Sequence, residues 1–464
     1  MIRGSNNYRT ENRWIKVRYI QMALMFLMMG ISYAIRTILS VAIVAMTDPE
    51  ASKNADVLTF DWKNTGVVLS SFYWSYAALQ FFAGHIGIAF GPRWILTIAM
   101  FVNALASLMI PTAATYWDYS GVVVCRLIQG VAQGFIIPLT HSMLGKWAPT
   151  EERSWLNTSV YSGCSIGTIL SMPITGYLSS SWWGWPSSFY FFGILGLVWC
   201  VLWLLLGADS PATHRSISMS ERVYIEQSLG QDNLKDVKIP WKAIITSLPY
   251  WAIIAGAIGE AWGSTFLITE IPTYISKVTD IDIEKNGLFS SAPYIVATIF
   301  TLLYGPLADY LILKGYTSRK TCRRLFHAAG AFIPSLALVW LAYEETPVGI
   351  AILLIVAITL NGAMFCGHNV NHIDISPRFS GVLFGISNGI GQTLAIFAPL
   401  LVDFIVLDET DKALWRTMFI IAAVIYAGTA AFFIVYLSAD RQWWDSAEGK
   451  INTEAQIEDN PKLI

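Results

Sequence analysis

Charged residues are scarce in this sequence. Of its 464 residues, 55% are hydrophobic and 13% are charged, whereas soluble globular chains carry about 25% charged residues. A soluble protein needs charge to cover its surface, so the composition argues against a soluble domain. The formal net charge of −2 is near neutral and gives no reason to expect a nucleic-acid partner.

Cysteine is also rare, and the motifs of soluble enzymes are missing. The five cysteines have no metal-ligand spacing, and their odd number gives no disulfide framework. No glycine-rich loop is followed by a lysine in the phosphate-binding pattern, which argues against an ATP-driven pump. We therefore expect no enzyme activity, no metal and no cofactor. Because residues 1–19 are polar and basic, we also expect no cleavable signal peptide.

Long apolar segments fill most of the chain. A helix needs about 20 apolar residues to cross about 30 Å of hydrocarbon. Segments of this kind lie at 19–46, 64–88, 94–115, 119–145, 155–179, 187–207, 249–275, 287–312, 325–343, 347–370, 378–406 and 414–438. They predict an all-α, polytopic membrane protein with twelve transmembrane helices.

The loops of this topology differ in charge. If the N-terminus is cytosolic, most of the 30 Lys and Arg residues fall in cytosolic segments, as the positive-inside rule requires. A polar stretch then divides the helices into six and six. The predicted parts are a cytosolic N-terminal segment (1–18), a first half (19–207), a cytosolic central loop (208–247), a second half (248–438) and a cytosolic tail (439–464). Two six-helix halves predict a major facilitator fold, with the substrate site near the midplane.

Two arginines lie inside predicted helices. A charge in hydrocarbon is costly, so it tends to face a cavity or a partner. Arg36 is in the middle of the first helix, and the forked guanidinium donors suit a carboxylate or a phosphate. We interpret Arg36 as an anion ligand, with Tyr33 one turn away on the same face. The alternative is a structural pair with an acidic residue.

Arg126 lies in the fourth helix, beside a polar and glycine-rich face. Gln129, Gly130, Gln133 and Gly134 line one side of this helix, and glycines allow a neighbouring helix to approach closely. Arg126 belongs either to the substrate site or to an internal hydrogen-bond network. Both interpretations stay open.

The seventh helix supplies a buried acid. Glu260, with Trp262 nearby, can pair with an arginine across the cavity, bind a cation or carry a proton, and a structural salt bridge is equally open. On the second helix, Tyr73 and Tyr76 can close over a substrate or simply pack.

Two groups lie near the predicted cytosolic ends. Asp309, Asp374 and Arg378 are predicted to form a cytosolic gate. His141, His368 and His372 are interpreted as structural hydrogen-bonding residues, with a proton relay as the alternative.

Three motif groups carry a family resemblance. They are Tyr33-Ala34-Ile35-Arg36 with Leu39-Ser40-Val41-Ala42, Lys146-Trp147-Ala148-Pro149 with Glu152-Arg153-Ser154, and Asn371-His372-Ile373-Asp374-Ile375-Ser376-Pro377-Arg378 with Gly385-Ile386-Ser387-Asn388. From about residue 20 to 445, the chain resembles the anion–cation symporter branch of the major facilitator superfamily. That branch holds sialin, the vesicular glutamate transporters and the type I sodium/phosphate cotransporters.

The resemblance implies roles for the two buried arginines. Arg36 matches the family's helix-one arginine, which is implied to bind the substrate anion, and Arg126 matches its helix-four arginine, which is implied in coupling and in the internal network. Sialin-like members have glutamates, implied to carry protons, where this chain has Gln129 and Gln133. Because a glutamine has no proton to give up, that route is in doubt here.

Two further positions depart from the vesicular glutamate transporters. These relatives have a histidine where Leu69 stands and an arginine where Glu260 stands, which puts glutamate-type recognition in doubt. The paired glutamines instead resemble the sodium/phosphate branch and the arthropod proteins named as inorganic phosphate cotransporters.

These observations predict a secondary active transporter of inorganic phosphate or a small organic anion. We expect sodium-coupled symport by alternating access, in a monomer at the plasma membrane. One alternative is a proton-coupled, sialin-like exporter of acidic sugars or amino acids in an endolysosomal or vesicular membrane, because the tail residues Asp459–Ile464 fit an acidic dileucine sorting pattern. Another is a non-transporting sensor on a transporter scaffold, although the cytosolic segments are too short for a signalling domain.

Overall fold

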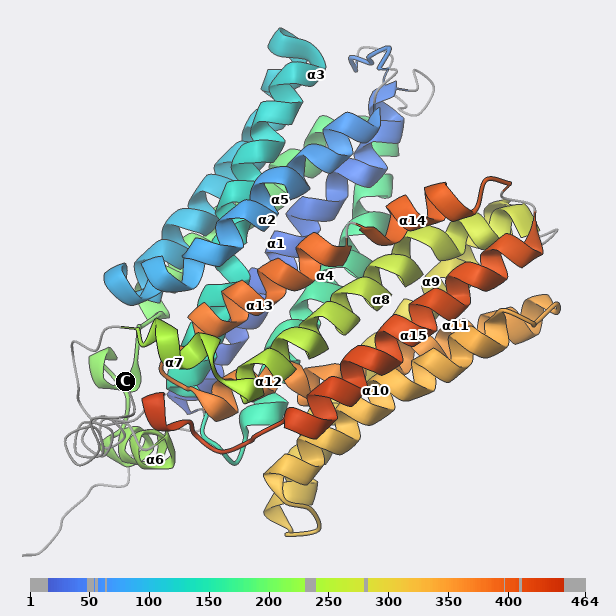
Figure 1. Cartoon of the computed structure of the whole chain (residues 1–464). Helices are drawn as coiled ribbons and strands as arrows, with labels where there is room; N and C mark the ends of the chain where they lie inside the picture. The colour runs from blue at the N-terminus through green and yellow to red at the C-terminus, as the bar shows by residue number, and fades with distance from the viewer. Residues whose placement is uncertain are drawn as a thin grey trace, which may run out of the picture.

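The computed structural model describes residues 16–47, 54, 57–62, 65–229, 239–278, 283–395, 397–408 and 411–445. Within these ranges every regular element is a helix (Figure 1). The first half contains α1 (Val17–Thr47), α2 (Thr65–Phe90), α3 (Pro92–Trp147), α4 (Arg153–Ser180) and α5 (Pro186–Leu206). The segment that follows holds η1 (Pro211–Thr213), α6 (Met219–Leu229) and α7 (Trp241–Ile245).

The second half begins with two long helices and then includes several short elements. Its elements are α8 (Leu248–Val278), α9 (Ile283–Leu313), α10 (Arg319–Leu341), α11 (Pro347–Asn361), η2 (Gly362–Cys366), α12 (His368–Ile375), α13 (Ser380–Ala395), α14 (Phe397–Ile405), α15 (Lys412–Tyr436) and η3 (Trp443–Asp445). The predicted tenth span corresponds to α11, η2 and α12 in succession. The predicted eleventh span corresponds to α13 and α14.

The long helix α3 contains two predicted spans. Its backbone leaves the helical region at Asp118, where φ is 53° and ψ is −148°. Gln133 Nε2 donates to Asn103 Oδ1 at 3.1 Å, although 30 residues of straight helix would measure about 45 Å. The two parts of α3 therefore fold back side by side. With this reversal, the described helices make six spans in each half, and the predicted fold class is confirmed.

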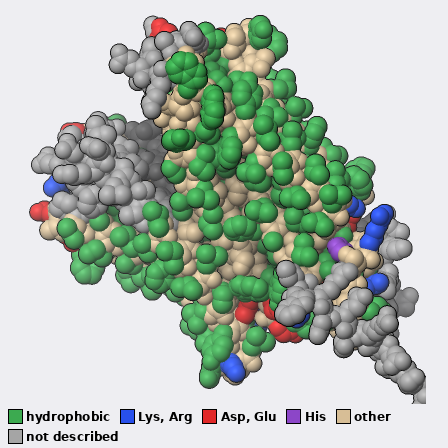
Figure 2. Space-filling view, turned by 180° about the vertical axis from the view of Figure 1, so that it is seen from behind, with side chains coloured by type: hydrophobic (Ala, Val, Ile, Leu, Met, Phe, Trp, Pro, Cys, Tyr) green, Lys and Arg blue, Asp and Glu red, His purple; other side chains and the backbone are tan. Residues whose placement is uncertain are grey.

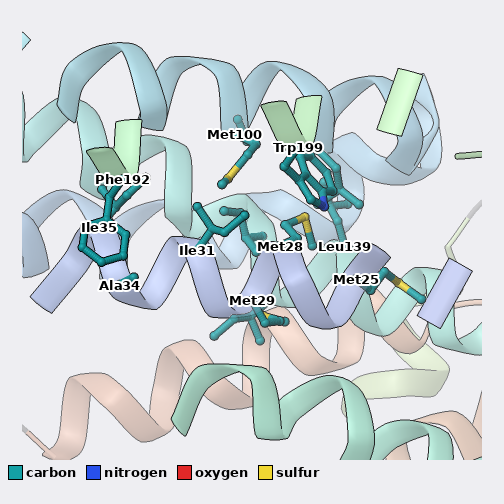
Figure 3. Close-up of a cluster of buried hydrophobic side chains, with 14 of the residues drawn as sticks. Met25, Met28, Met29, Ile31, Ala34, Ile35, Met100, Leu139, Phe192 and Trp199 are labelled. Atoms are coloured by element: carbon teal, nitrogen blue, oxygen red, sulfur yellow. The ribbon is translucent and has the colours of Figure 1, made fainter. Parts of the chain in front are cut away.

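Apolar surface and small residues match this membrane fold. Seven helical stretches of the described chain are long and apolar enough to span a membrane by themselves. Figure 2 shows hydrophobic side chains over most of the described surface on the face in view, with charged side chains near its margins. Figure 3 shows α1 side chains such as Met28 and Ile35 packing between neighbouring helices. A Cβ on Gly167 of α4 would lie 2.1 Å from the carbonyl oxygen of Gly30, so glycine allows α1 and α4 to touch.

The two halves meet at one end of the bundle. We call it the basic end, and it is the end where α1 begins, α15 ends and α6 and α7 lie (Figure 1). There, a Cβ on Gly84 of α2 would lie 2.5 Å from the backbone of Gly381 on α13, and one on Gly305 of α9 would lie 2.0 Å from Thr158 Oγ1 of α4. The ribbons of the halves diverge away from this end (Figure 1). The structure is therefore a conformation closed at the basic end.

Some predictions lie beyond these observations. The domain boundaries and the cytosolic location of the basic end stay predictions. The sorting pattern Asp459–Ile464 lies outside the described residues.

Candidate functional site

Arg36 lies in an aromatic cage in the first half. Its Cζ atom is 4.3 Å from the ring centroid of Tyr33, 4.7 Å from that of Phe72 and 4.5 Å from that of Tyr76. A guanidinium at such distances is attracted to the ring faces. The predicted proximity of Tyr33 to Arg36 is therefore observed, and Tyr76 of α2 joins the same cage. Tyr73 instead contacts Phe72 edge-on and is 54% exposed, so it lies beside the cage.

Arg126 lies next to Arg36, on the second part of α3. Its Nη1 donates to the carbonyl oxygen of Arg36 at 3.2 Å and to Gln129 Oε1 at 3.2 Å. Its Cζ is 4.9 Å from the Phe72 ring, so both guanidinium groups lean on one phenylalanine. Sequence reasoning missed Phe72, although it lies one helical turn before Tyr76 on α2.

The two glutamines orient these arginines. Gln133 Oε1 accepts a hydrogen bond from Arg36 Nε at 3.1 Å, while its Nε2 donates to the Ser32 carbonyl at 3.0 Å and to Asn103. Both amide oxygens thus face a guanidinium. Glycine lets α2 approach here, because a Cβ on Gly130 would lie 2.2 Å from the Phe72 carbonyl oxygen. On the second part of α3, Gln129 and Gln133 of the polar face hydrogen-bond to Arg126 and Arg36.

Neither arginine has an acidic partner in the described part of the chain. Among the residues that the structure describes, no carboxylate lies within 4.0 Å of the guanidinium nitrogens of Arg36 or Arg126. Arg126 Nε and Gln129 Nε2 are buried donors that have no hydrogen-bond partner among the described residues. Buried charges and donors are costly when unpaired. This site is therefore suited to an anion that accepts hydrogen bonds.

Glu260 belongs to a separate polar group in the second half. Ser264 Oγ lies 3.1 Å from Glu260 Oε1 and 3.4 Å from Asn361 Oδ1, and Asn361 Nδ2 donates to the hydroxyl of Tyr426. Glu260 forms no salt bridge with the described residues, so it does not pair with either arginine in this conformation. Trp262 is 5% exposed and packs in the second-half core. Ser264, Asn361 and Tyr426 were not found by sequence reasoning.

Two of the predicted gate residues join the halves at the basic end. Asp309 on α9 accepts hydrogen bonds from the backbone amides of Ser154 at 3.2 Å and Trp155 at 2.7 Å. It thereby caps the positive N-terminal end of α4. Arg378 is placed differently, because its Cζ is 5.8 Å from the ring of Phe379 in the turn before α13.

Asp374 forms a buried ion cluster beside this cap. Its Oδ1 accepts from Arg153 Nη1 at 2.9 Å across the interface between the two halves, which we call the seam. Its Oδ2 accepts from Arg323 Nε at 2.7 Å. Arg323 Nη1 also donates to Ser154 Oγ at 2.8 Å. Sequence reasoning did not identify Arg153 as a gate residue, although it lies in the Glu152-Arg153-Ser154 motif. These contacts hold the basic end closed.

Comparison with known proteins gives the family. Residues 25–399 match the model described as Major Facilitator Superfamily. The "Putative inorganic phosphate cotransporter" of Drosophila melanogaster is 34% identical, covering 94% of this chain and 88% of that protein. "Vesicular glutamate transporter 2" of Homo sapiens is 33% identical, covering 93% of this chain and 76% of that protein.

Solved structures agree on the fold. The transporter FucP in its outward conformation has a TM-score of 0.65 at 13% identity, covering 91% of this chain and all of that one. The proton:xylose symporter XylE has a TM-score of 0.65 at 14% identity, covering 88% and 94%. The curated relatives are named as transporters, in agreement with the expectation that the chain is not an enzyme. The chain belongs to the Major Facilitator Superfamily, in the group that holds the inorganic phosphate cotransporters and the vesicular glutamate transporters.

Proposed function

We propose that this protein is a secondary active transporter that moves a small anion by alternating access. The observation that carries the proposal is the pair Arg36 and Arg126, which lie side by side without a described carboxylate to neutralise them. The relatives are named for phosphate and glutamate, and both of these are anions. Inorganic phosphate or a small organic anion is the proposed substrate. The hydroxyls of Tyr33 and Tyr76 are further donors beside it.

We propose that sodium drives this transport. Glu260, Ser264 and Asn361 place oxygen atoms together, and oxygen ligands suit a hard cation. The helix also changes character at this point, since α11 ends at Asn361 and the 3-10 turn η2 begins at Gly362. Broken helices expose carbonyl groups that coordinate coupling ions in other transporters. Proton coupling is the second candidate, because Glu260 is a buried carboxylate that can take up a proton.

The membrane and orientation are also part of the proposal. We place the protein in the plasma membrane as a monomer, with both termini and the basic end in the cytosol. The basis is the excess of Lys and Arg in the loops on that side. The closed end described above then faces the cytosol. An endolysosomal or vesicular membrane is the alternative, which localisation of a tagged protein in its native cell type distinguishes.

The arginine site is tested by substitution in a transport assay. Arg36→Lys keeps the charge but removes the forked donor set, and we expect it to abolish uptake of labelled phosphate while surface expression stays normal. Arg222→Lys is the matched control, because Arg222 pairs with Glu226 on α6 and is remote from the cage. Normal uptake by Arg36→Lys would overturn the site assignment.

Sodium coupling needs a separate experiment in proteoliposomes. We expect uptake to fall when external sodium is replaced by choline at constant pH and voltage. Uptake that does not depend on sodium but follows an imposed pH gradient would show that protons, not sodium ions, drive transport. Glu260→Gln would then be expected to abolish the dependence of uptake on the pH gradient.

A further inference from the structure

Four of the six histidines are buried, and two of them meet where the halves join. His141 is on α3 in the first half, whereas His372 and His368 are on α12 and His327 is on α10 in the second. Their exposed fractions are between 0% and 3%. The ring centroids of His141 and His372 are 5.4 Å apart, and those of His327 and His368 are 5.3 Å apart. The anion site and the cation site proposed above use none of them.

One carbonyl group joins His141 to His372. The carbonyl oxygen of Asn369 lies 3.0 Å from His141 Nε2 and 2.8 Å from His372 Nδ1. Because a carbonyl oxygen only accepts hydrogen bonds, both of these ring nitrogens must carry a hydrogen. The bond from His141 to Asn369 crosses from the first half to the second. It exists only while the basic end is closed.

The other nitrogen of each ring faces a hydroxyl group. His141 Nδ1 lies beside the Tyr161 hydroxyl at 2.5 Å, and His372 Nε2 lies 2.7 Å from Ser387 Oγ. A hydroxyl can donate to a neutral ring or accept from a protonated one. Each ring therefore has a hydrogen-bond partner in either protonation state, and the geometry does not prevent a proton from binding.

The surrounding charges decide the effect of such a proton. Both rings pack against Phe384, at 4.1 Å for His141 and 5.1 Å for His372. The titratable groups on the elements around the pair include Tyr161 and Arg153 on α4, Lys146 on α3, His368 and Asp374 on α12, and His327 and Arg323 on α10. Glu260 on α8 lies one helical turn from Gly256, which packs against His368, but its carboxylate forms no ion pair or hydrogen bond with His141 or His372 in the described chain. The carboxylate of Asp374 is already shared by two arginines, and α13 carries no titratable side chain. An imidazolium in the closed seam would be buried without a counter-charge, which is costly.

We infer that the His141–His372 pair is a proton-binding site whose protonation opens the basic end. A proton that is costly to hold in the closed seam is bound more favourably when the seam is open to water. By linkage, protonation must then shift the population toward the open state. Low pH on that side favours opening, and high pH favours closure. The proton enters and leaves on one side, so the pair regulates the cycle while sodium coupling is unchanged. The inference rests on the proposed alternating access.

The test measures opening directly, without any substrate. Thr158 is buried at the seam against Gly305 of the other half, so Thr158→Cys reacts with a maleimide only when the basic end opens. The five native cysteines are first replaced, and reaction rates are divided by those of the exposed position Lys314→Cys, which corrects for thiolate chemistry. As the pH at the basic end falls from 8 to 5.5, the range in which histidine changes charge, we expect the normalised rate to rise.

Substitutions then identify the residues responsible. His141→Gln with His372→Gln should abolish the pH response, and His372→Gln alone should reduce it if the double variant does not fold. The matched control is His85→Gln, because His85 is exposed on α2 outside the cluster and its variant should keep the full response. A normalised rate that ignores pH, or a double variant that responds like the parent, overturns the inference. Since alkylation needs no anion, neither result depends on whether the anion assignment is correct.

Discussion

The bond between Arg153 and Asp374 offers a quantitative test of how the basic end is held closed. Arg153 Nη1 donates to Asp374 Oδ1 at 2.9 Å across the seam. Its Nε and Nη2 atoms are buried without a partner in the described chain. Replacing Arg153 by Gln therefore removes this charged inter-half bond, a longer one of 3.4 Å to the Ile373 carbonyl oxygen and two unsatisfied donors. Asp374 keeps its bond to Arg323 at 2.7 Å, so the second half should stay folded.

The expected size follows from the kind of bond that is lost. A hydrogen bond to a charged group is worth about 1.5–3 kcal/mol. Because each 1.4 kcal/mol is a factor of ten, Arg153→Gln should shift the equilibrium toward the open basic end by roughly 10- to 150-fold. The assay is the rate of maleimide reaction at Thr158→Cys, measured at fixed pH and without substrate.

A second buried arginine at the same end provides the control. Arg18 pairs with Glu152 at 2.8 Å and with Glu221 at 3.4 Å, but these residues belong to the first half and to α6, so none of these bonds crosses the seam. Arg18→Gln should lower thermal stability without speeding the reaction at residue 158. Equal acceleration by both variants would refute the reasoning, because it would mean that general destabilisation opens the seam. An unchanged rate in Arg153→Gln would refute it as well.

Three further changes test other contacts. Gln133→Glu places a carboxylate beside Arg36 and should weaken anion binding by internal neutralisation, so that the KM for uptake rises and falls again at low pH. Gly167→Ala forces a Cβ against the backbone of α1 and should cost about 1–3 kcal/mol by overpacking, visible as a lower Tm, whereas Gly176→Ala, with nothing within 4 Å of the added atom, should leave the Tm unchanged. Glu221→Ala removes the carboxylate that accepts from the first backbone amides of α1 and should cost about 0.5–2 kcal/mol, measured as a lower Tm with normal anion affinity.

The helices and the arginine site were predictable from local sequence for a physical reason. Spans follow from apolar length, and the turn that brings Tyr33 near Arg36 follows from helical spacing. The neighbours supplied by other helices were not predictable in this way. Phe72 contacts both arginines only because α2 packs on α3, and Asp309 caps α4 only because the two halves are closed together.

The second half shows the same limit. Glu260 was identified as a buried acid, but its partners Ser264 and Asn361 depend on where α11 ends. The sequence does not indicate the break at η2, because residues 347–370 form one continuous apolar segment and predict a single span. The reversal in α3 was easier to predict, because two apolar segments lie on either side of Asp118.

Buried arginines have different partners in the binding site and at the seam. At the basic end, Arg153 and Arg323 share the carboxylate of Asp374, so each of these cations has an acidic partner within the protein. In the cage, Arg36 and Arg126 are held by carbonyl and amide oxygens and by ring faces, none of which carries a full negative charge. A buried cation without a counter-ion is costly, so a fold that retains two of them side by side gains most when an anion arrives. Arg153 and Arg323 therefore stabilise contacts within the protein, whereas Arg36 and Arg126 remain available to bind an anionic substrate.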